Sequence, residues 1–137
     1  MLGYSVYSEA GGVAKTTTAA NCAVAHARHG LDVLVIDLDP QNASLSYLFD
    51  VDQDRAEGDA DNLVRHLIGR PRGDLKDLIH ETDEGIDVLP THNMNEKLTE
   101  LLLKTAEIEE QTHGDTNYEF QKHSQLLTVL QLSLIHI

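Results

Sequence analysis

The most restrictive feature of the sequence is a glycine-containing loop between a predicted strand and a predicted helix. Residues 8–14 read S-E-A-G-G-V-A; they follow a run rich in β-forming residues, 2–7, and precede an alanine-rich helical segment, 15–29. A nearly continuous apolar run, 31–37, comes after Gly30 and is typical of a buried parallel strand. Strand, loop, helix and strand in this order predict a βαβ unit, with a right-handed crossover and a parallel sheet.

The remaining predicted elements are short, and a chain of 137 residues suits one domain. The pattern predicts helices over 43–49, 62–68, 74–80, 95–111 and 118–131, a third strand over 85–89 that Pro90 ends, and an acidic loop over 50–61. Leu98, Leu101, Leu102 and Ile108 form one apolar stripe on the helix 95–111. The sequence therefore predicts an α/β fold, a parallel sheet flanked by helices.

The loop carries the groups that a phosphate site requires. Gly11 and Gly12 supply backbone amides that can approach an anion closely. Lys15 stands at the start of the helix, where it can reach the outer phosphates, and the Thr16 hydroxyl can hold Mg²⁺. The partial positive charge of the helix N-terminus adds to the attraction.

The general pattern G-x-x-x-x-G-K-[ST] is broken at both glycine positions, by Glu9 and Ala14. If the backbone at Ala14 needs a positive φ, its β-carbon costs about 1–2 kcal/mol. The alternative interpretation is a glycine turn before an ordinary helix. The combination of strand, helix and Lys-Thr-Thr favours the phosphate loop.

A second motif follows the second predicted strand. Asp37, Asp39, Pro40 and Gln41 lie at its carboxyl end, the edge where open α/β sheets bind ligands. Two carboxylates one residue apart, beside a triphosphate site, can hold Mg²⁺ and its water and orient an attacking water. The alternative is a polar strand end followed by a proline turn.

Together the two motifs resemble those of the ParA/Soj partition ATPases, within the ParA–MinD class of deviant Walker A P-loop proteins. The family's first motif, K-G-G-V-G-K-T-T, is matched by Gly11, Gly12, Val13, Lys15, Thr16 and Thr17. Its second motif, D-x-D-P-Q, is matched in full by Asp37, Asp39, Pro40 and Gln41. The Pro-Gln ending favours ParA over MinD.

The resemblance implies ATP and Mg²⁺ as cofactors and a P-loop NTPase-type sheet. The phosphates would be cradled by Gly11, Gly12, Val13, Ala14 and Lys15, with Thr17 at the α-phosphate and Thr16 on Mg²⁺.

The same resemblance assigns roles to the two carboxylates. Asp39 would position or activate the hydrolytic water, so that Lys15 and Asp39 are the catalytic candidates, and Asp37 would support the metal shell. Ala10 replaces the family's hallmark lysine, which reaches the partner's phosphates across the dimer. We therefore expect either slow hydrolysis or a replacement cation from elsewhere, and a faster single turnover in Ala10→Lys.

The function implied is an ATP-driven partition protein for chromosomes or plasmids. It would form an ATP-dependent homodimer, bind DNA without sequence specificity and respond to a ParB-like adaptor. Two alternatives stay open. One is a metabolic P-loop enzyme, such as an ATP-dependent amidase or ligase of cofactor synthesis, and the other is a non-catalytic remnant, which Ala10 and Ala14 favour.

The end of the chain departs from the family pattern. No strand ending in Asp-x-Pro-Pro follows residue 110, and residues 132–137 look unlike what precedes them. We expect residues 1–131 to be the N-terminal part of a ParA-type nucleotide-binding domain, with an incomplete sheet, and 132–137 to be a non-native tail. An open sheet edge would favour aggregation.

Composition places further bounds on the chain. Its net charge of -13 repels nucleic acid phosphates and anionic membranes at long range, and acids spread along the whole sequence favour a salt-adapted surface. No apolar stretch is long enough for a membrane span, and no signal peptide is predicted, so we expect a cytoplasmic protein. The single cysteine, Cys22, excludes an internal disulfide.

One weaker pattern could suggest calcium. Asp50, Asp52 and Asp54 have the spacing of a calcium loop, but Arg55 stands where glycine is needed and Asp61 where glutamate is needed. We interpret this segment as a solvated acidic loop.

Two further patterns are interpreted as surface features. His26 and His29 could share a metal, but they lack a third ligand in the sequence nearby. Arg65, Arg70 and Arg72 have acidic neighbours, and we assign them mainly to ion pairing rather than to nucleic acid.

Overall fold

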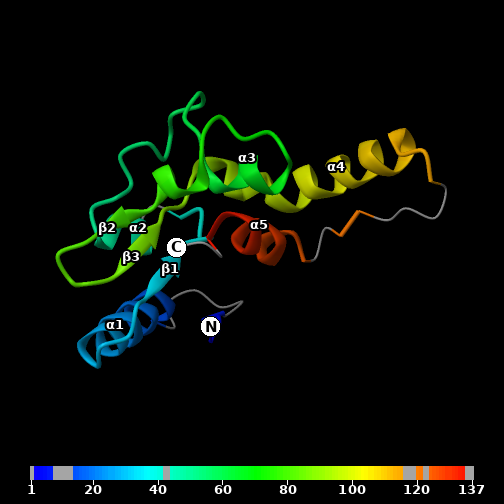
Figure 1. The fold of residues 1–137 in the computed structure, drawn as a ribbon. Helices are drawn as coiled ribbons and strands as arrows, with labels where there is room; N and C mark the ends of the chain where they lie inside the picture. Colours follow the sequence, from blue (N-terminus) through cyan, green and yellow to red (C-terminus); the bar gives the residue numbers. More distant parts are fainter. Residues whose placement is uncertain (1, 8–13, 42–43, 116–119, 122–123, 135–137) are drawn as a thin grey trace.

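In the computed structural model, the chain is a small α/β fold with helices on both sides of a sheet (Figure 1). The structure describes residues 2–7, 14–41, 44–115, 120–121 and 124–134. The elements are α1 (Lys15–Arg28), β1 (Leu34–Ile36), α2 (Leu45–Leu48), α3 (Leu63–Leu67), η1 (Leu75–Leu78), β2 (His80–Glu81), β3 (Asp87–Leu89), η2 (Asn93–Lys97), α4 (Leu98–Thr112) and α5 (Gln125–Leu134). The predicted α/β class is confirmed.

The sheet has three strands in the order β1-β3-β2. β1 runs parallel to β3, with Val35 opposite Val88, and β2 runs antiparallel to β3, with His80 opposite Val88. The third predicted strand is therefore confirmed, and Pro90 follows its last residue. The sheet is mixed rather than purely parallel, because a tight turn closed by Thr82 N–H on the Ile86 carbonyl (3.1 Å) folds β2 back onto β3. The predicted helix 74–80 is correspondingly shorter, a 3₁₀ turn that ends before β2.

The predicted strand at residues 2–7 is not formed. These residues have no regular structure and are all exposed, from Val6 at 37% to Leu2 at 92%. Tyr4 touches α1 through a 3.1 Å hydrogen bond between its hydroxyl and His26 Nε2. β-forming residues make a strand only where a sheet offers them a partner. The predicted βαβ unit through residues 2–7 is therefore wrong, and the parallel partner of β1 is β3.

The core lies on both faces of β3, whose successive side chains point in opposite directions. On one face Val88 joins the buried cluster Ala23, Val51, Ile86 and Val88, which places α1 against the sheet. On the other face Leu89 joins Leu63, Leu67, Leu75 and Val129, which places α3, η1 and α5 there. The sheet is therefore a layer between α1 on one face and α3, η1 and α5 on the other (Figure 1).

The predicted helices are found with shifted ends. α1 matches its prediction and is followed by Gly30 at φ 83°. In α4 the predicted apolar stripe reaches the core only in its first turns, because Leu98 and Leu102 pack there while Ile108 is 52% exposed. The second half of α4 extends away from the sheet (Figure 1).

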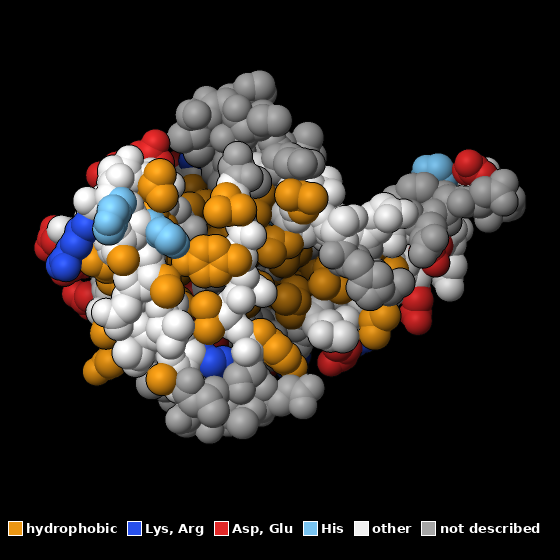
Figure 2. Space-filling model, turned by 90° about the horizontal axis from the view of Figure 1, so that it is seen from below, with side chains coloured by type: hydrophobic (Ala, Val, Ile, Leu, Met, Phe, Trp, Pro, Cys, Tyr) orange, Lys and Arg blue, Asp and Glu red, His pale blue; other side chains and the backbone are white. Residues whose placement is uncertain are grey.

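Apolar side chains are visible across the face of the molecule seen in Figure 2, beside the histidines. β1 is an outer strand of the sheet, with β3 as its neighbour in the part of the chain that the structure describes. The expectation of aggregation rests on these two features and stays a prediction. In the described part of the chain, no helix is long and apolar enough to cross a membrane.

Candidate functional site

The start of α1 has the features of an anion site. Ala14 precedes the helix in the left-handed conformation, with φ 59° and ψ 31°, so the positive φ considered above as a condition is present. The first backbone bond of the helix is donated by the Thr18 N–H to the Ala14 carbonyl (2.9 Å). The amides of Lys15, Thr16 and Thr17 precede this bond and therefore have no partner within the helix, and Ala14 at the N-cap has no side chain that could accept from them.

Lys15 stands in this first turn, where helices usually carry an acidic residue. A lysine at this place weakens an isolated helix and favours one whose end faces an anion. Lys15 and Thr16 are half-buried and Thr17 is exposed. These donors fit a polyphosphate. The expected ligands Gly11, Gly12 and Val13, and also Ala10, lie outside the described residues.

Asp37 is buried at the carboxyl end of β1, with 3% exposure. Its amide donates to the Leu89 carbonyl (3.0 Å), which extends the parallel ladder by one residue. Its Oδ1 accepts from the Asp39 amide (3.1 Å), and its Oδ2 accepts from the Ser46 amide (2.8 Å) and the Ser46 hydroxyl (2.6 Å). Since both oxygens are held by protein donors, this carboxylate fits a supporting role better than direct contact with a metal.

Ser46 connects this carboxylate to the next strand. Its hydroxyl donates to Asp37 and accepts from the Thr91 amide (2.8 Å), which lies just beyond β3. The ends of β1 and β3 and the helix α2 are thereby joined at one buried point.

Asp39 is half-buried, and its carboxylate accepts fewer hydrogen bonds than that of Asp37. Its Oδ1 accepts from the Gln41 amide (2.9 Å), while its Oδ2 has no hydrogen-bond partner among the described residues. A free carboxylate oxygen at the carboxyl edge of a sheet can bind a metal-bound water or orient a nucleophilic water. The structure thus brings Asp37 and Asp39 together. Among the described residues, no hydrogen bond or ion pair joins either of them to Lys15, Thr16 or Thr17.

Three residues of this site were not predicted from the sequence. Ser46 and Thr91 were not singled out, and Arg55 was noted only as the residue that breaks a calcium pattern. Arg55 is buried (8% exposed) and its Nη1 donates to the Gln41 carbonyl (2.6 Å). A lone arginine within an acidic stretch was the signal that could have drawn attention to it.

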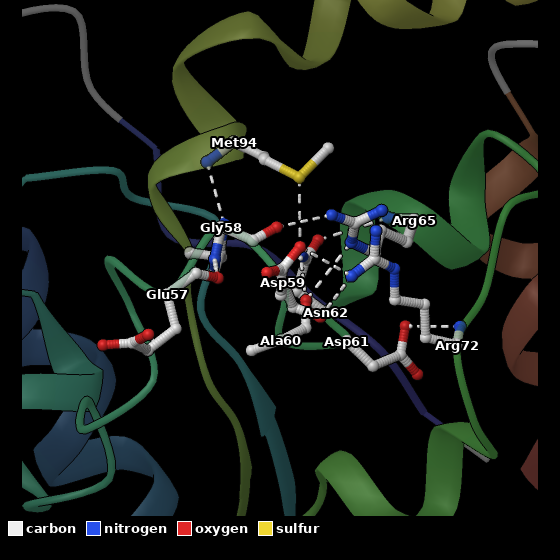
Figure 3. Close-up of polar contacts among 10 residues, drawn as sticks. Glu57, Gly58, Asp59, Ala60, Asp61, Asn62, Arg65, Arg72 and Met94 are labelled. Atoms are coloured by element: carbon white, nitrogen blue, oxygen red, sulfur yellow. Dashed lines mark hydrogen bonds and ion pairs between the residues drawn. The ribbon is translucent and has the colours of Figure 1, made fainter.

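Two further arginines, Arg65 and Arg72, hold the acidic loop in place (Figure 3). Arg65 donates to the carbonyls of Gly58 (2.6 Å) and Ala60 (3.2 Å), and Arg72 pairs with the carboxylate of Asp59 (3.1 Å). The assignment to ion pairing is confirmed for Arg72, whereas Arg65 binds carbonyl oxygens. No three or more His, Cys, Asp or Glu side chains gather as a metal site within the described ranges.

Asp61 is anchored in the same loop. Its carboxylate accepts from His66 Nε2 (2.7 Å) and from the Arg72 amide (3.0 Å). Burial alone would raise the pKa of the Asp61 carboxyl, but these hydrogen bonds outweigh burial and hold the pKa below its ordinary value.

The layered α/β fold and the two motifs define a protein of the P-loop ATPase class. A family model described as AAA domain (AAA_31) matches residues 4–123, and the chain belongs to this family.

Two proteins of Methanocaldococcus jannaschii are similar in sequence. They are the uncharacterised ATP-binding proteins MJ0169, 37% identical over 87 residues, and MJ0547, 38% identical over 86 residues. The matches cover 64% and 63% of this chain but only 30% of each relative. The chain therefore spans less than a third of the length of these relatives.

Solved structures of cobyrinic acid a,c-diamide synthase from Mycobacterium smegmatis are similar in fold. The form with bound ATP analog and magnesium has a TM-score of 0.69, and the form with ADP and magnesium has 0.70; both are 26% identical to this chain. The similarity covers 93% of this chain and 44% of the synthase chain.

Proposed function

We propose that this chain is the phosphate-binding part of an ATPase that takes ATP with Mg²⁺. The observation that carries the proposal is the start of α1, where a left-handed Ala14 without a capping side chain, the amides of the first turn and Lys15 can together bind an anion. The curated relatives are named ATP-binding proteins, and the synthase structures hold an ATP analog or ADP with magnesium. Both findings support the same ligand.

The residues at the start of α1 bind the phosphates and the metal, and the two carboxylates after β1 act on the attacking water. Lys15 neutralises the outer phosphates, the Thr16 hydroxyl holds the metal, and Thr17 contacts the α-phosphate. When bound, Mg²⁺ supplies the charge that offsets the phosphate oxygens. Asp39 uses its free oxygen to orient the attacking water, and Asp37 fixes the backbone of Asp39 through the 3.1 Å hydrogen bond.

For the whole protein we propose a partition ATPase. Support comes from the complete D-x-D-P-Q match at residues 37–41 and from the glycine motif. In this proposal ATP binding assembles a homodimer that holds DNA without sequence specificity, and hydrolysis, stimulated by a ParB-like adaptor, disperses it. Because these 137 residues carry a net charge of -13, the contacts with DNA would have to come from other parts of the whole protein.

A second candidate is an ATP-dependent amidation in cofactor synthesis. It is favoured by the similarity to cobyrinic acid a,c-diamide synthase over 93% of this chain. The two candidates differ in what accelerates hydrolysis. Duplex DNA with an adaptor would stimulate a partition ATPase, whereas a carboxylic acid substrate with an amide donor would stimulate an amidating enzyme.

Nucleotide binding tests the shared core of both candidates. A fluorescent ATP analogue is titrated into the chain at high salt with Mg²⁺, and Lys15→Ala is compared with Lys76→Ala, whose lysine is exposed on η1. We expect Lys15→Ala to weaken binding by roughly tenfold or more, and Lys76→Ala to leave it unchanged. Equal binding by all three proteins, or none by the parent chain, would refute the proposal.

A further inference from the structure

Arg55 connects the segment 37–41, which carries the second motif, to the start of η2. It lies in the acidic loop, but its side chain is buried with 8% exposure. Its Nη1 donates to the Gln41 carbonyl (2.6 Å), and its Nε donates to Asn93 Oδ1 (3.0 Å). The Asn93 amide donates back to the Arg55 carbonyl (3.0 Å), so that these two residues are joined twice.

The chemistry of these partners is unusual for a buried arginine. In the described part of the chain, no carboxylate lies within ion-pair distance of the guanidinium. A buried charge without a counter-charge is costly, and it is tolerated only where fixed polar groups replace the lost water. Here those groups are a backbone carbonyl and a side-chain amide. Removing the guanidinium therefore removes two hydrogen bonds that hold neighbouring segments together, and no ion pair.

The hydrogen bond from Arg55 is accepted by Gln41, the residue that also bonds to the Asp39 carboxylate. The Gln41 amide donates to Asp39 Oδ1, and the Gln41 carbonyl accepts from Arg55. Gln41 is therefore held on both of its backbone polar groups, by a carboxylate on one side and a guanidinium on the other. Asp39 is fixed in turn through its own amide on Asp37.

We propose that Arg55 is a positioning residue for Asp39. By fixing Gln41 against Asn93, it keeps Asp39 Oδ1 bonded to the Gln41 amide and leaves Oδ2 free for the water or metal of the site. The proposal rests on the proposed use of Mg-ATP. In addition, Arg55 lies outside the two sequence motifs and contacts η2, and it controls how strongly nucleotide binding depends on Mg²⁺.

The first test needs no nucleotide. Backbone hydrogen exchange is measured on the free chain for the segment that contains the Asp39 and Gln41 amides, in Arg55→Met, Arg55→Lys and Asn93→Ala. Arg72→Met is the matched control, because it also removes one arginine charge beside the acidic loop but its side chain is 47% exposed. We expect exchange to rise about tenfold in Arg55→Met, less in Arg55→Lys and Asn93→Ala, and not at all in Arg72→Met.

We expect the Arg55→Met variant to remain folded. A cavity of about 100 Å³ lies against Arg55 and is also lined by Thr91 and His92, so water can reach the groups that the guanidinium leaves. If this variant still fails to fold, Asn93→Ala and Arg55→Lys carry the test. Unchanged exchange in the folded variants, or an equal rise in Arg72→Met, would overturn the proposal.

The second test concerns the site itself. Two quantities are measured for the parent chain and for Arg55→Met. The first is the Mg²⁺ concentration at which the enhancement of nucleotide binding is half-maximal, and the second is the nucleotide affinity in excess chelator, without metal. Arg55→Met should raise that Mg²⁺ concentration by about fivefold to tenfold and change the metal-free affinity less than twofold. Equal loss of both would make Arg55 merely structural. If the parent chain binds no nucleotide, the proposed function fails, while hydrogen exchange still decides whether Arg55 holds the loop.

Discussion

Ser46 contacts the carboxylate of Asp37 twice, through its amide (2.8 Å) and through its hydroxyl (2.6 Å), and both bonds end on the same oxygen, Oδ2. The hydroxyl also accepts the Thr91 amide (2.8 Å). One serine thereby fixes the supporting carboxylate of the candidate site and ties β1 to β3. Another serine two residues earlier, Ser44, is equally buried, yet its hydroxyl has no hydrogen-bond partner among the residues that the structure describes.

The two serines give a matched pair for mutation. Ser46→Ala removes a charge-assisted bond and leaves the Thr91 amide unsatisfied, so we expect it to lower the free energy of unfolding by about 2–3 kcal/mol. Ser44→Ala removes a hydroxyl without a partner, and we expect a change of less than about 0.5 kcal/mol or a gain in stability. Urea unfolding followed by circular dichroism suits a chain without tryptophan. Equal losses in both variants would contradict this hydrogen-bond network.

The sequence predicted the place of Asp37 and Asp39 because the apolar run 31–37 was expected to be a strand, and β1 forms within it over Leu34–Ile36, although its residues are half-buried rather than buried. It could not predict Ser46, since a serine between leucine and tyrosine carries no pattern, and its importance comes from a contact with Thr91, 45 positions later in the chain. Arg55 was hidden for the same reason: its partners Gln41 and Asn93 are close only in the folded chain.

The strand predictions differed in outcome for a physical reason. The strand predicted over 85–89 forms as β3, Asp87–Leu89, because Val88 and Leu89 are buried on opposite faces and have a strand on each side. Residues 2–7 have as strong a β preference but lie exposed, since nothing described pairs with them. Intrinsic preference therefore identified the buried strand and misplaced the terminal one.

Ala14 offers a test of backbone strain at the phosphate loop. It holds φ 59°, a conformation that costs an alanine about 1–2 kcal/mol and a glycine much less. We expect Ala14→Gly to raise the free energy of unfolding by about 1 kcal/mol. Ala25→Gly, at an exposed position inside α1, should lower it by about 1 kcal/mol. The same sign for both substitutions in thermal unfolding would show that Ala14 is not strained.

Asn62 begins α3 and holds the end of the acidic loop. Its side-chain oxygen accepts the Arg65 amide (3.2 Å) and its Nδ2 donates to the Ala60 carbonyl (3.3 Å), at 5% exposure (Figure 3). Loss of this cap in Asn62→Ala should cost about 1–2 kcal/mol in urea unfolding. Asn21→Ala, in the exposed middle of α1, is the control. It should be neutral or slightly stabilising, because alanine is the better helix former. A smaller loss at Asn62 than at Asn21 would argue against the cap.

The Asp61 carboxylate predicts how stability responds to acid. Hydrogen bonds from the Arg72 amide and His66 hold its folded pKa below the unfolded value of about 3.9, so its stabilising contribution is complete above that value and is lost as the pH falls through the folded pKa. The stability difference between the parent chain and Asp61→Asn should therefore shrink from about pH 5 to pH 3. Asp59→Asn, at a fully exposed side chain, should show almost no difference at any pH. Urea titrations at half-unit pH steps measure both, and a difference for Asp61→Asn that is constant with pH would mean that its carboxylate is not stabilised by these contacts.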